Sequence, residues 1–124
     1  MLVEDEAIIR RLLTLFLVRN KKHAFTVYSA ENGEEGVKLY DKLVSEGNKP
    51  DLVLMDLRMP VMDGVEATRR IIEHDPRAKI YLFTAYTGTE MERDALNAGA
   101  KGAVSKDADW HRLVDNILDI LESF

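Results

Sequence analysis

The chain has 124 residues, no cysteine and a formal net charge of −5, and 46% of its residues are hydrophobic. This composition is typical of one globular domain over residues 1–124 that needs neither disulfide bonds nor thiolate metal sites. No apolar run approaches the roughly 18 residues of a membrane span, and an acidic chain lacks the clustered basic charge that binds nucleic-acid backbones. We therefore expect a cytoplasmic protein with no direct contact to membranes or nucleic acid.

Short apolar runs alternate with helix-like segments along the whole chain. The middle runs are nearly continuous apolar, as in strands that are covered on both faces. Alternation of this kind predicts repeated βα units and hence an α/β fold with a parallel sheet. The first run is short, so either a few upstream residues were removed or this strand is unusually brief. We predict five strands, at Met1–Val3, Phe25–Tyr28, Leu52–Met55, Ile80–Phe83 and Gly102–Val104.

The segments between these strands place apolar residues at helical spacing, and each apolar stripe is expected to pack on the sheet. In the first helix the stripe consists of Ile8, Ile9, Leu12, Leu13 and Phe16. Pro76 is expected to end the third helix near His74. Three helix starts are predicted from capping residues followed three positions later by a carboxylate, namely Asn32 with Glu35, Asp63 with Glu66, and Thr87 with Glu90.

Chemically reactive side chains follow the predicted strands. Glu4 and Asp5 follow the first strand, Asp56 the third, Thr84 the fourth and Lys106 the fifth. In an open parallel sheet these strand ends share one edge, and ligands bind there where the strand order reverses. A doubly wound sheet of order 2-1-3-4-5 makes the first and third strands neighbours at that reversal. The sequence thus predicts three carboxylates in one pocket.

Such a cluster requires positive charge nearby. Two carboxylates about 4 Å apart repel by roughly 4 kcal/mol at an effective dielectric constant near 20. Lys106 is one candidate for the compensating charge, and the all-oxygen ligand set suits Mg²⁺. Asp56 could then attack phosphorus to form an acyl phosphate, while Lys106 and Thr84 contact the phosphoryl oxygens. We interpret the pocket as a site of phosphoryl transfer.

Four ordered motifs resemble the receiver domain of two-component response regulators over essentially the whole chain. Residues 54–64 are similar to the phosphorylation-site loop of that family, and residues 3–6 to its acidic opening. Thr84 resembles the family's switch threonine, and Lys106 its lysine. The resemblance implies a flavodoxin-like (βα)5 three-layer sandwich with strand order 2-1-3-4-5.

The resemblance also implies roles for individual residues. Asp56 would accept a phosphoryl group from the phosphohistidine of a sensor histidine kinase or of a phosphotransfer protein. Glu4, Asp5 and Asp56, with the Arg58 carbonyl, would bind Mg²⁺, and Thr84 would move toward the phosphoryl group. A downstream protein would contact the face formed by the fourth helix, fifth strand and fifth helix, and phosphorylation could produce a homodimer.

Two positions depart from the usual pattern of the family. Asp107 stands where proline usually follows the lysine, and Ala103 stands where an aromatic residue is usual. The usual rotation of an aromatic ring therefore cannot occur at residue 103. We expect the switch to act through Tyr86 or through movement of residues 85–88. Because Arg58 and Tyr86 occupy positions that flank the attacking water in the family, their bulk predicts slow loss of the phosphoryl group.

Two other functions fit some of these residues. A Mg²⁺-dependent phosphohydrolase could use the same aspartyl phosphate to turn over small substrates, and sustained multiple turnover would distinguish it. A degenerate receiver would only dock proteins, but the intact acidic pocket argues against that alternative. A flavin site is disfavoured because the short segment 87–89 follows the fourth strand and not the first.

Overall fold

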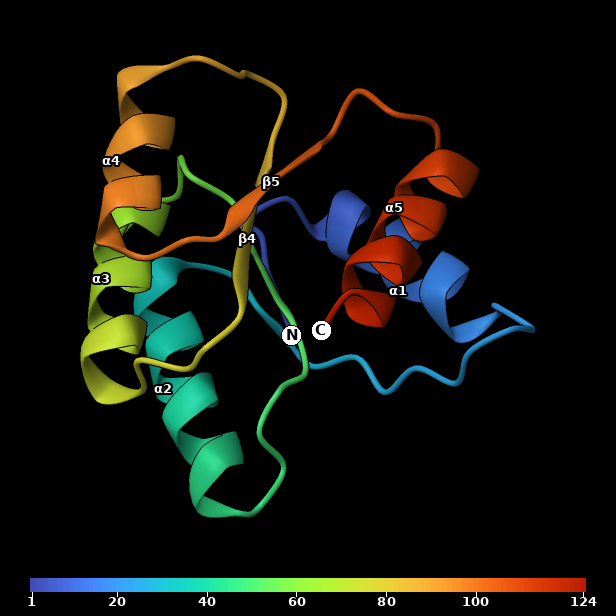
Figure 1. The fold of residues 1–124 in the computed structure, drawn as a ribbon, viewed down its shortest axis with the longest axis horizontal. Coiled ribbons are helices and arrows are strands. Elements are labelled where there is room, and N and C mark those ends of the chain that lie inside the picture. Colours follow the sequence, from blue (N-terminus) through green and yellow to red (C-terminus); the bar gives the residue numbers. More distant parts are fainter.

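The computed structural model describes residues 1–124 and contains one five-stranded parallel sheet between two layers of helices (Figure 1). The strand order is β2-β1-β3-β4-β5, with every neighbouring pair parallel. The predicted doubly wound α/β fold is therefore confirmed. In chain order the elements are β1 (Leu2–Val3), α1 (Ala7–Val18), β2 (Ser29–Ala30), α2 (Gly33–Ser45), β3 (Val53–Met55), α3 (Gly64–His74), β4 (Ile80–Thr84), α4 (Glu90–Ala98), β5 (Gly102–Ser105) and α5 (Trp110–Glu122).

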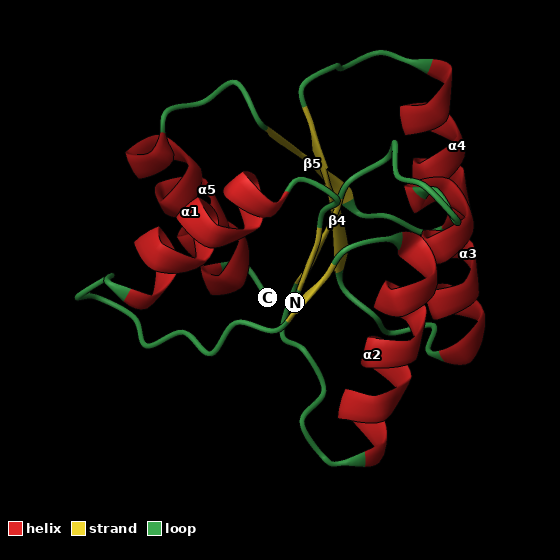
Figure 2. Ribbon diagram, turned by 180° about the vertical axis from the view of Figure 1, so that it is seen from behind, coloured by secondary structure: helices red, strands yellow, loops and turns green.

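The helices divide between the two faces of the sheet. Helices α1 and α5 cover one face, and α2, α3 and α4 cover the other (Figures 1 and 2). Because successive strand residues point to opposite faces, Val53 and Met55 pack toward α2, α3 and α4, whereas Leu54 packs toward α1 and α5. None of the helices is both long enough and apolar enough to cross a membrane.

Two of the three predicted helix starts are confirmed. Asn32 accepts a hydrogen bond from the main-chain nitrogen of Glu35 at 2.9 Å, and Asp63 caps α3 in the same way. Helix α3 ends at His74 as predicted, two residues before Pro76.

The predicted start of the fourth helix at Thr87 is wrong. Thr89 is the capping residue of α4, and its hydroxyl accepts from the main-chain nitrogen of Glu92 at 3.1 Å. Both threonine–glutamate pairs have the same spacing. Gly88 has a φ of +74°, in the left-handed region that interrupts a helix, and this conformation places the start after it.

The predicted second strand is also displaced. Strand β2 comprises Ser29 and Ala30, whereas residues 25–28 lie outside the sheet although Phe25 and Val27 are half-buried. Strand β1 selects this register, since Leu2 pairs with Ser29 and Val3 with Ala30. The other predicted strands differ from the observed ones by one residue at an end.

The predicted apolar stripe of α1 packs only in part. Leu13 is fully buried, but Ile8 is 58% exposed. Helical spacing alone did not reveal that Ile8 lies at the solvent side of the first turn.

Candidate functional site

The register of the parallel sheet brings the predicted site residues together at one edge. Val3 pairs with Met55, and the main-chain nitrogen of Asp56 donates to the carbonyl oxygen of Val3 at 2.9 Å. Thr84 likewise pairs with Ser105, and the nitrogen of Lys106 donates to the Thr84 carbonyl at 2.9 Å. Residues that directly follow β1, β3 and β5 therefore lie side by side.

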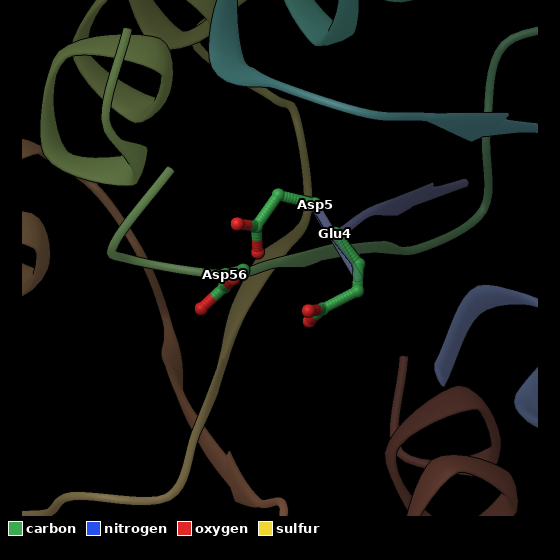
Figure 3. A group of neighbouring side chains, drawn as sticks. All are labelled: Glu4, Asp5 and Asp56. Carbon is green, nitrogen blue, oxygen red and sulfur yellow. The ribbon is translucent and has the colours of Figure 1, made fainter. Parts of the chain in front are cut away.

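Three carboxylates form the acidic part of this edge. Glu4, Asp5 and Asp56 each offer one oxygen, and these oxygens all lie within 4.8 Å of one another (Figure 3). Glu4 is completely buried and Asp56 is 7% exposed, whereas Asp5 is open to solvent. In Figure 3 the Asp5 side chain points toward Asp56, and that of Glu4 points to the other side of the strand end. The three carboxylates and the exposed approach fit a hard divalent cation such as Mg²⁺.

Lys106 is the positive group that meets the buried carboxylates. Its Nζ atom lies 2.7 Å from Oε2 of Glu4 and 3.1 Å from Oδ1 of Asp56. The ammonium group is the partner of this buried Glu4 oxygen. Burial by itself would lower the pKa of Lys106, but the hydrogen bond and charge of Glu4, with those of Asp56, raise it above its ordinary value.

The electrostatics of the pocket favour the neutral forms of the acids. Burial, and then the negative charge of Glu4, raise the pKa of Asp56 to about 7, although Lys106 acts in the opposite direction. Burial also raises the pKa of Glu4, against the hydrogen bond from Lys106. One lysine therefore does not offset the two buried carboxylates, and a divalent cation would favour their ionised forms.

The hydroxyl group of Thr84 is bonded within its own loop. Its Oγ1 atom donates to the carbonyl oxygen of Tyr86 and accepts from the nitrogen of Tyr86, each at 3.1 Å. The Tyr86 side chain is 66% exposed. A cavity of about 270 Å³ opens between this loop and the carboxylates, and Arg58 also lines it. There is accordingly space beside Asp56 for a group of phosphoryl size.

The loop after Asp56 is held by close main-chain packing. The nitrogen of Gly64 donates to the carbonyl oxygen of Leu57 at 2.8 Å, and a Cβ atom at residue 64 would lie 2.0 Å from the carbonyl oxygen of Asp56. Only glycine fits there. Val61, in the same loop, has a φ of +68° and is 75% exposed, a conformation that is strained for a β-branched residue.

The two departures from the family pattern are both visible in the structure. The nitrogen of Asp107 donates to Oγ of Ser105 at 3.1 Å, a bond that a proline could not make. Ala103 pairs with Leu82 across the sheet and leaves its position on β5 exposed.

Sequence reasoning missed two residues that contact Glu4. The main-chain nitrogen of Glu6 donates to Oε1 of Glu4 at 3.3 Å, and a guanidinium nitrogen of Arg10 donates to the Glu4 carbonyl oxygen at 2.6 Å. Arg10 is followed by a second arginine, Arg11, and nothing in the sequence distinguishes the two.

The chain matches the response regulator receiver domain family over residues 1–118. It is 36% identical over 122 residues to the chemotaxis protein CheY of Listeria monocytogenes, a match that covers 98% of this chain and 94% of that protein. It is 37% identical over 121 residues to CheY of Halobacterium salinarum, with the same coverage of 98% and 94%.

Solved structures show the same similarity. A two-component response regulator of the LuxR family from Aurantimonas sp. SI85-9A1 superposes with a TM-score of 0.82 and 36% identity, over 99% of this chain and 84% of that one. The CheX–CheY–BeF3–Mg²⁺ complex from Borrelia burgdorferi gives a TM-score of 0.81 and 26% identity, over 96% and 85% of the two chains.

Proposed function

Since the chain belongs to the response regulator receiver domain family of two-component systems, we propose that it accepts a phosphoryl group on Asp56 and thereby changes its protein contacts. All 124 residues would act as one receiver domain in the cytoplasm. The donor would be the phosphohistidine of a sensor histidine kinase or of a phosphotransfer protein. The observation that carries this proposal is the cluster of Glu4, Asp5 and Asp56 with Lys106 between the two buried carboxylates.

The chemistry is a displacement at phosphorus. An ionised Asp56 oxygen forms a bond to phosphorus, the phosphorus–nitrogen bond to the donor imidazole breaks, and the imidazole nitrogen keeps the electron pair. Lys106 would then exchange part of its contact with Asp56 for the new phosphoryl oxygens. Because burial raises the pKa of Asp56 to about 7, the reaction requires conditions that keep this carboxyl group ionised.

Glu4, Asp5 and Asp56 would hold Mg²⁺, together with the main-chain carbonyl of Arg58. When bound, Mg²⁺ supplies positive charge to the phosphoryl oxygens. The CheY relative from Borrelia burgdorferi was solved in a complex that contains Mg²⁺, which supports the same cation for this chain. Arg58 lines the cavity next to Asp56, as a ligand at this position requires.

Thr84 would transmit the change to the surface. Its hydroxyl proton is donated to the carbonyl oxygen of Tyr86, so donation to a phosphoryl oxygen would break that bond and loosen the loop of residues 85–88. Ala103 offers no ring to rotate, and Tyr86 would therefore move in its place. A downstream protein would detect this change on the α4–β5–α5 face, where a homodimer could also form. The bulk of the Arg58 and Tyr86 side chains would hinder the attacking water and so slow hydrolysis of the aspartyl phosphate.

The direct test is to incubate the protein with Mg²⁺ and a small phosphodonor and to look by mass spectrometry for a labile phosphoryl adduct. The wild type should form a single adduct, and Asp56→Asn should form none. Asp94→Asn is the matched control, because Asp94 is an exposed residue of α4 that does not line the cavity. Absence of an adduct on the wild type with Mg²⁺ present would refute the proposal.

The same reaction separates this function from a phosphohydrolase. With excess phosphodonor, a receiver releases phosphate only as slowly as its long-lived adduct decays, whereas a phosphohydrolase would turn over many small substrates without accumulating the adduct. Sustained release that requires Asp56, without an accumulated adduct, would favour the enzyme.

A further inference from the structure

Arg10 makes one specific contact, with the main chain beside the acidic pocket. Its guanidinium group donates to the carbonyl oxygen of Glu4 at 2.6 Å across six residues of chain. Arg10 lies on the first turns of α1 and is half-buried. This charge-assisted hydrogen bond is of the stronger kind found in proteins.

The contacted carbonyl belongs to the peptide group that joins Glu4 to Asp5. Glu4 lies one residue beyond β1, and its nitrogen is held by the carbonyl oxygen of Ala30 at 3.0 Å. Its carbonyl oxygen lies beyond the end of β1 and accepts a hydrogen bond from Arg10. The orientation of this peptide group decides where the next side chain, Asp5, points.

Asp5 depends on that orientation more than the other carboxylates do. Glu4 and Asp56 are buried and each has an ion pair with Lys106. The Asp5 side chain is exposed, has no ion pair with Lys106, and interacts with the carboxyl group of Asp56. With no positive partner, its place within 4.8 Å of the other two carboxylate oxygens relies mainly on the main chain.

We infer that Arg10 is a positioning residue for cation binding, which holds the Glu4–Asp5 peptide group so that the Asp5 carboxylate faces Glu4 and Asp56. The inference rests on the proposed function in one respect, that this pocket binds Mg²⁺. Arg10 touches no reacting group. Its effect reaches the pocket through the main chain.

The charge of Arg10 acts in the opposite direction from its hydrogen bond. A positive group near the pocket repels a cation, so removing charge alone would strengthen Mg²⁺ binding. Arg11 reports this charge effect by itself, because it is the next residue on α1, is exposed and forms no hydrogen bond or ion pair. The two arginines thus form a matched pair that separates positioning from electrostatics.

The experiment measures Mg²⁺ dissociation constants by titration calorimetry for the wild type, Arg10→Met, Arg11→Met and Arg10→Lys at one pH and ionic strength. Arg10→Met should bind Mg²⁺ about tenfold more weakly, as when groups that orient metal ligands are removed. Arg11→Met should bind as tightly as the wild type or slightly more tightly. Arg10→Lys keeps a cationic donor and should recover part of the loss.

A second measurement observes the peptide group directly. Amide NMR signals of Glu4, Asp5 and Glu6 in the metal-free protein should shift in Arg10→Met and stay in place in Arg11→Met. If Arg10→Met does not fold, the comparison of Arg10→Gln with Arg11→Gln decides, since both remove one positive charge and only the first loses the contact with the Glu4 carbonyl oxygen.

The outcomes distinguish the two proposals. Equal Mg²⁺ affinities for Arg10→Met and Arg11→Met, or for the two glutamine variants, would overturn the role of Arg10 and leave the proposed function standing. A wild type that binds no Mg²⁺ would overturn both.

Discussion

The ammonium group of Lys106 lies 2.7 Å from a carboxylate oxygen of Glu4, a side chain with no exposed surface. These two residues are 102 positions apart in the chain, and the sheet joins them through β1, β3 and β4. Buried ion pairs add little net stability, but the loss of one partner leaves an uncompensated charge.

Replacement of Lys106 by methionine should therefore destabilise the protein strongly. Without the ammonium group, Glu4 and Asp56 share a pocket with no positive partner, and we expect a loss of roughly 3 kcal/mol at pH 8 without divalent cations. Lys101→Met is the control, because Lys101 is exposed and its side chain makes no ion pair. Urea unfolding measures the free energy of unfolding of the Lys106→Met and Lys101→Met variants. Similar midpoints for the two variants would contradict the importance of the buried pair.

The raised pKa of Asp56 predicts how stability depends on pH. The folded-state pKa is about 7, above the ordinary value of 3.8, so between these values the folded state binds more protons than the unfolded state. The free energy of unfolding should consequently fall as pH rises from about 4 to about 7. Thermal unfolding in EDTA should show this decline, and saturating Mg²⁺ should remove most of it.

Asp56→Asn should abolish the part of this decline that Asp56 contributes. The amide cannot ionise, so the variant should be more stable than the wild type at pH 8 in EDTA, by roughly 2 to 4 kcal/mol at about 1.4 kcal/mol for each pKa unit. Asp94→Asn should leave the pH profile unchanged. A wild-type profile that is flat between pH 4 and 7 would contradict the prediction.

Gly64→Ala should distort the loop that carries Asp56. The new methyl group would lie 2.0 Å from the Asp56 carbonyl oxygen, and the main chain must move, at a cost of about 3 kcal/mol or more. Gly47→Ala is the comparison, since residue 47 has a φ of +78° but open space around it, and should cost only about 1 to 2 kcal/mol. Chemical unfolding gives the two costs, which should differ clearly.

Val61→Asn should stabilise the protein. Val61 has a left-handed φ of +68°, which asparagine adopts more readily than a β-branched residue does, and the gain should be about 1 kcal/mol. Val61→Thr keeps the branched Cβ atom and should bring no gain. Equal unfolding temperatures for the asparagine and threonine variants would show that the strain is absent.

Thr84→Val should loosen the loop of residues 85–88 in the unphosphorylated protein. Valine has nearly the same shape but cannot make the two bonds to the main chain of Tyr86. Hydrogen exchange at the Tyr86 amide should be about fivefold to tenfold faster, corresponding to about 1 kcal/mol for one hydrogen bond. Thr84→Ser retains the hydroxyl group and should behave as the wild type.

Much of this structure follows from local patterns in the sequence. Apolar runs and capping pairs predict the alternation of strands and helices, and the starts at Asn32 and Asp63 are correct because a cap and its partner are three residues apart. The second strand and the start of α4 were misplaced. Pairing with β1 sets the position of the second strand. The left-handed turn at Gly88 sets the start of α4.

The order of amino acids is enough to show which chemical groups end the strands: acids after β1 and β3, a hydroxyl group at the end of β4 and an amine after β5. The partners of these groups depend on the folded chain. The contacts of Lys106 with Glu4, of Thr84 with Tyr86 and of Arg10 with the Glu4 carbonyl depend on sheet register and loop geometry. Such contacts are set by the packing of the whole chain, so two adjacent arginines that look equivalent in sequence occupy different environments in space.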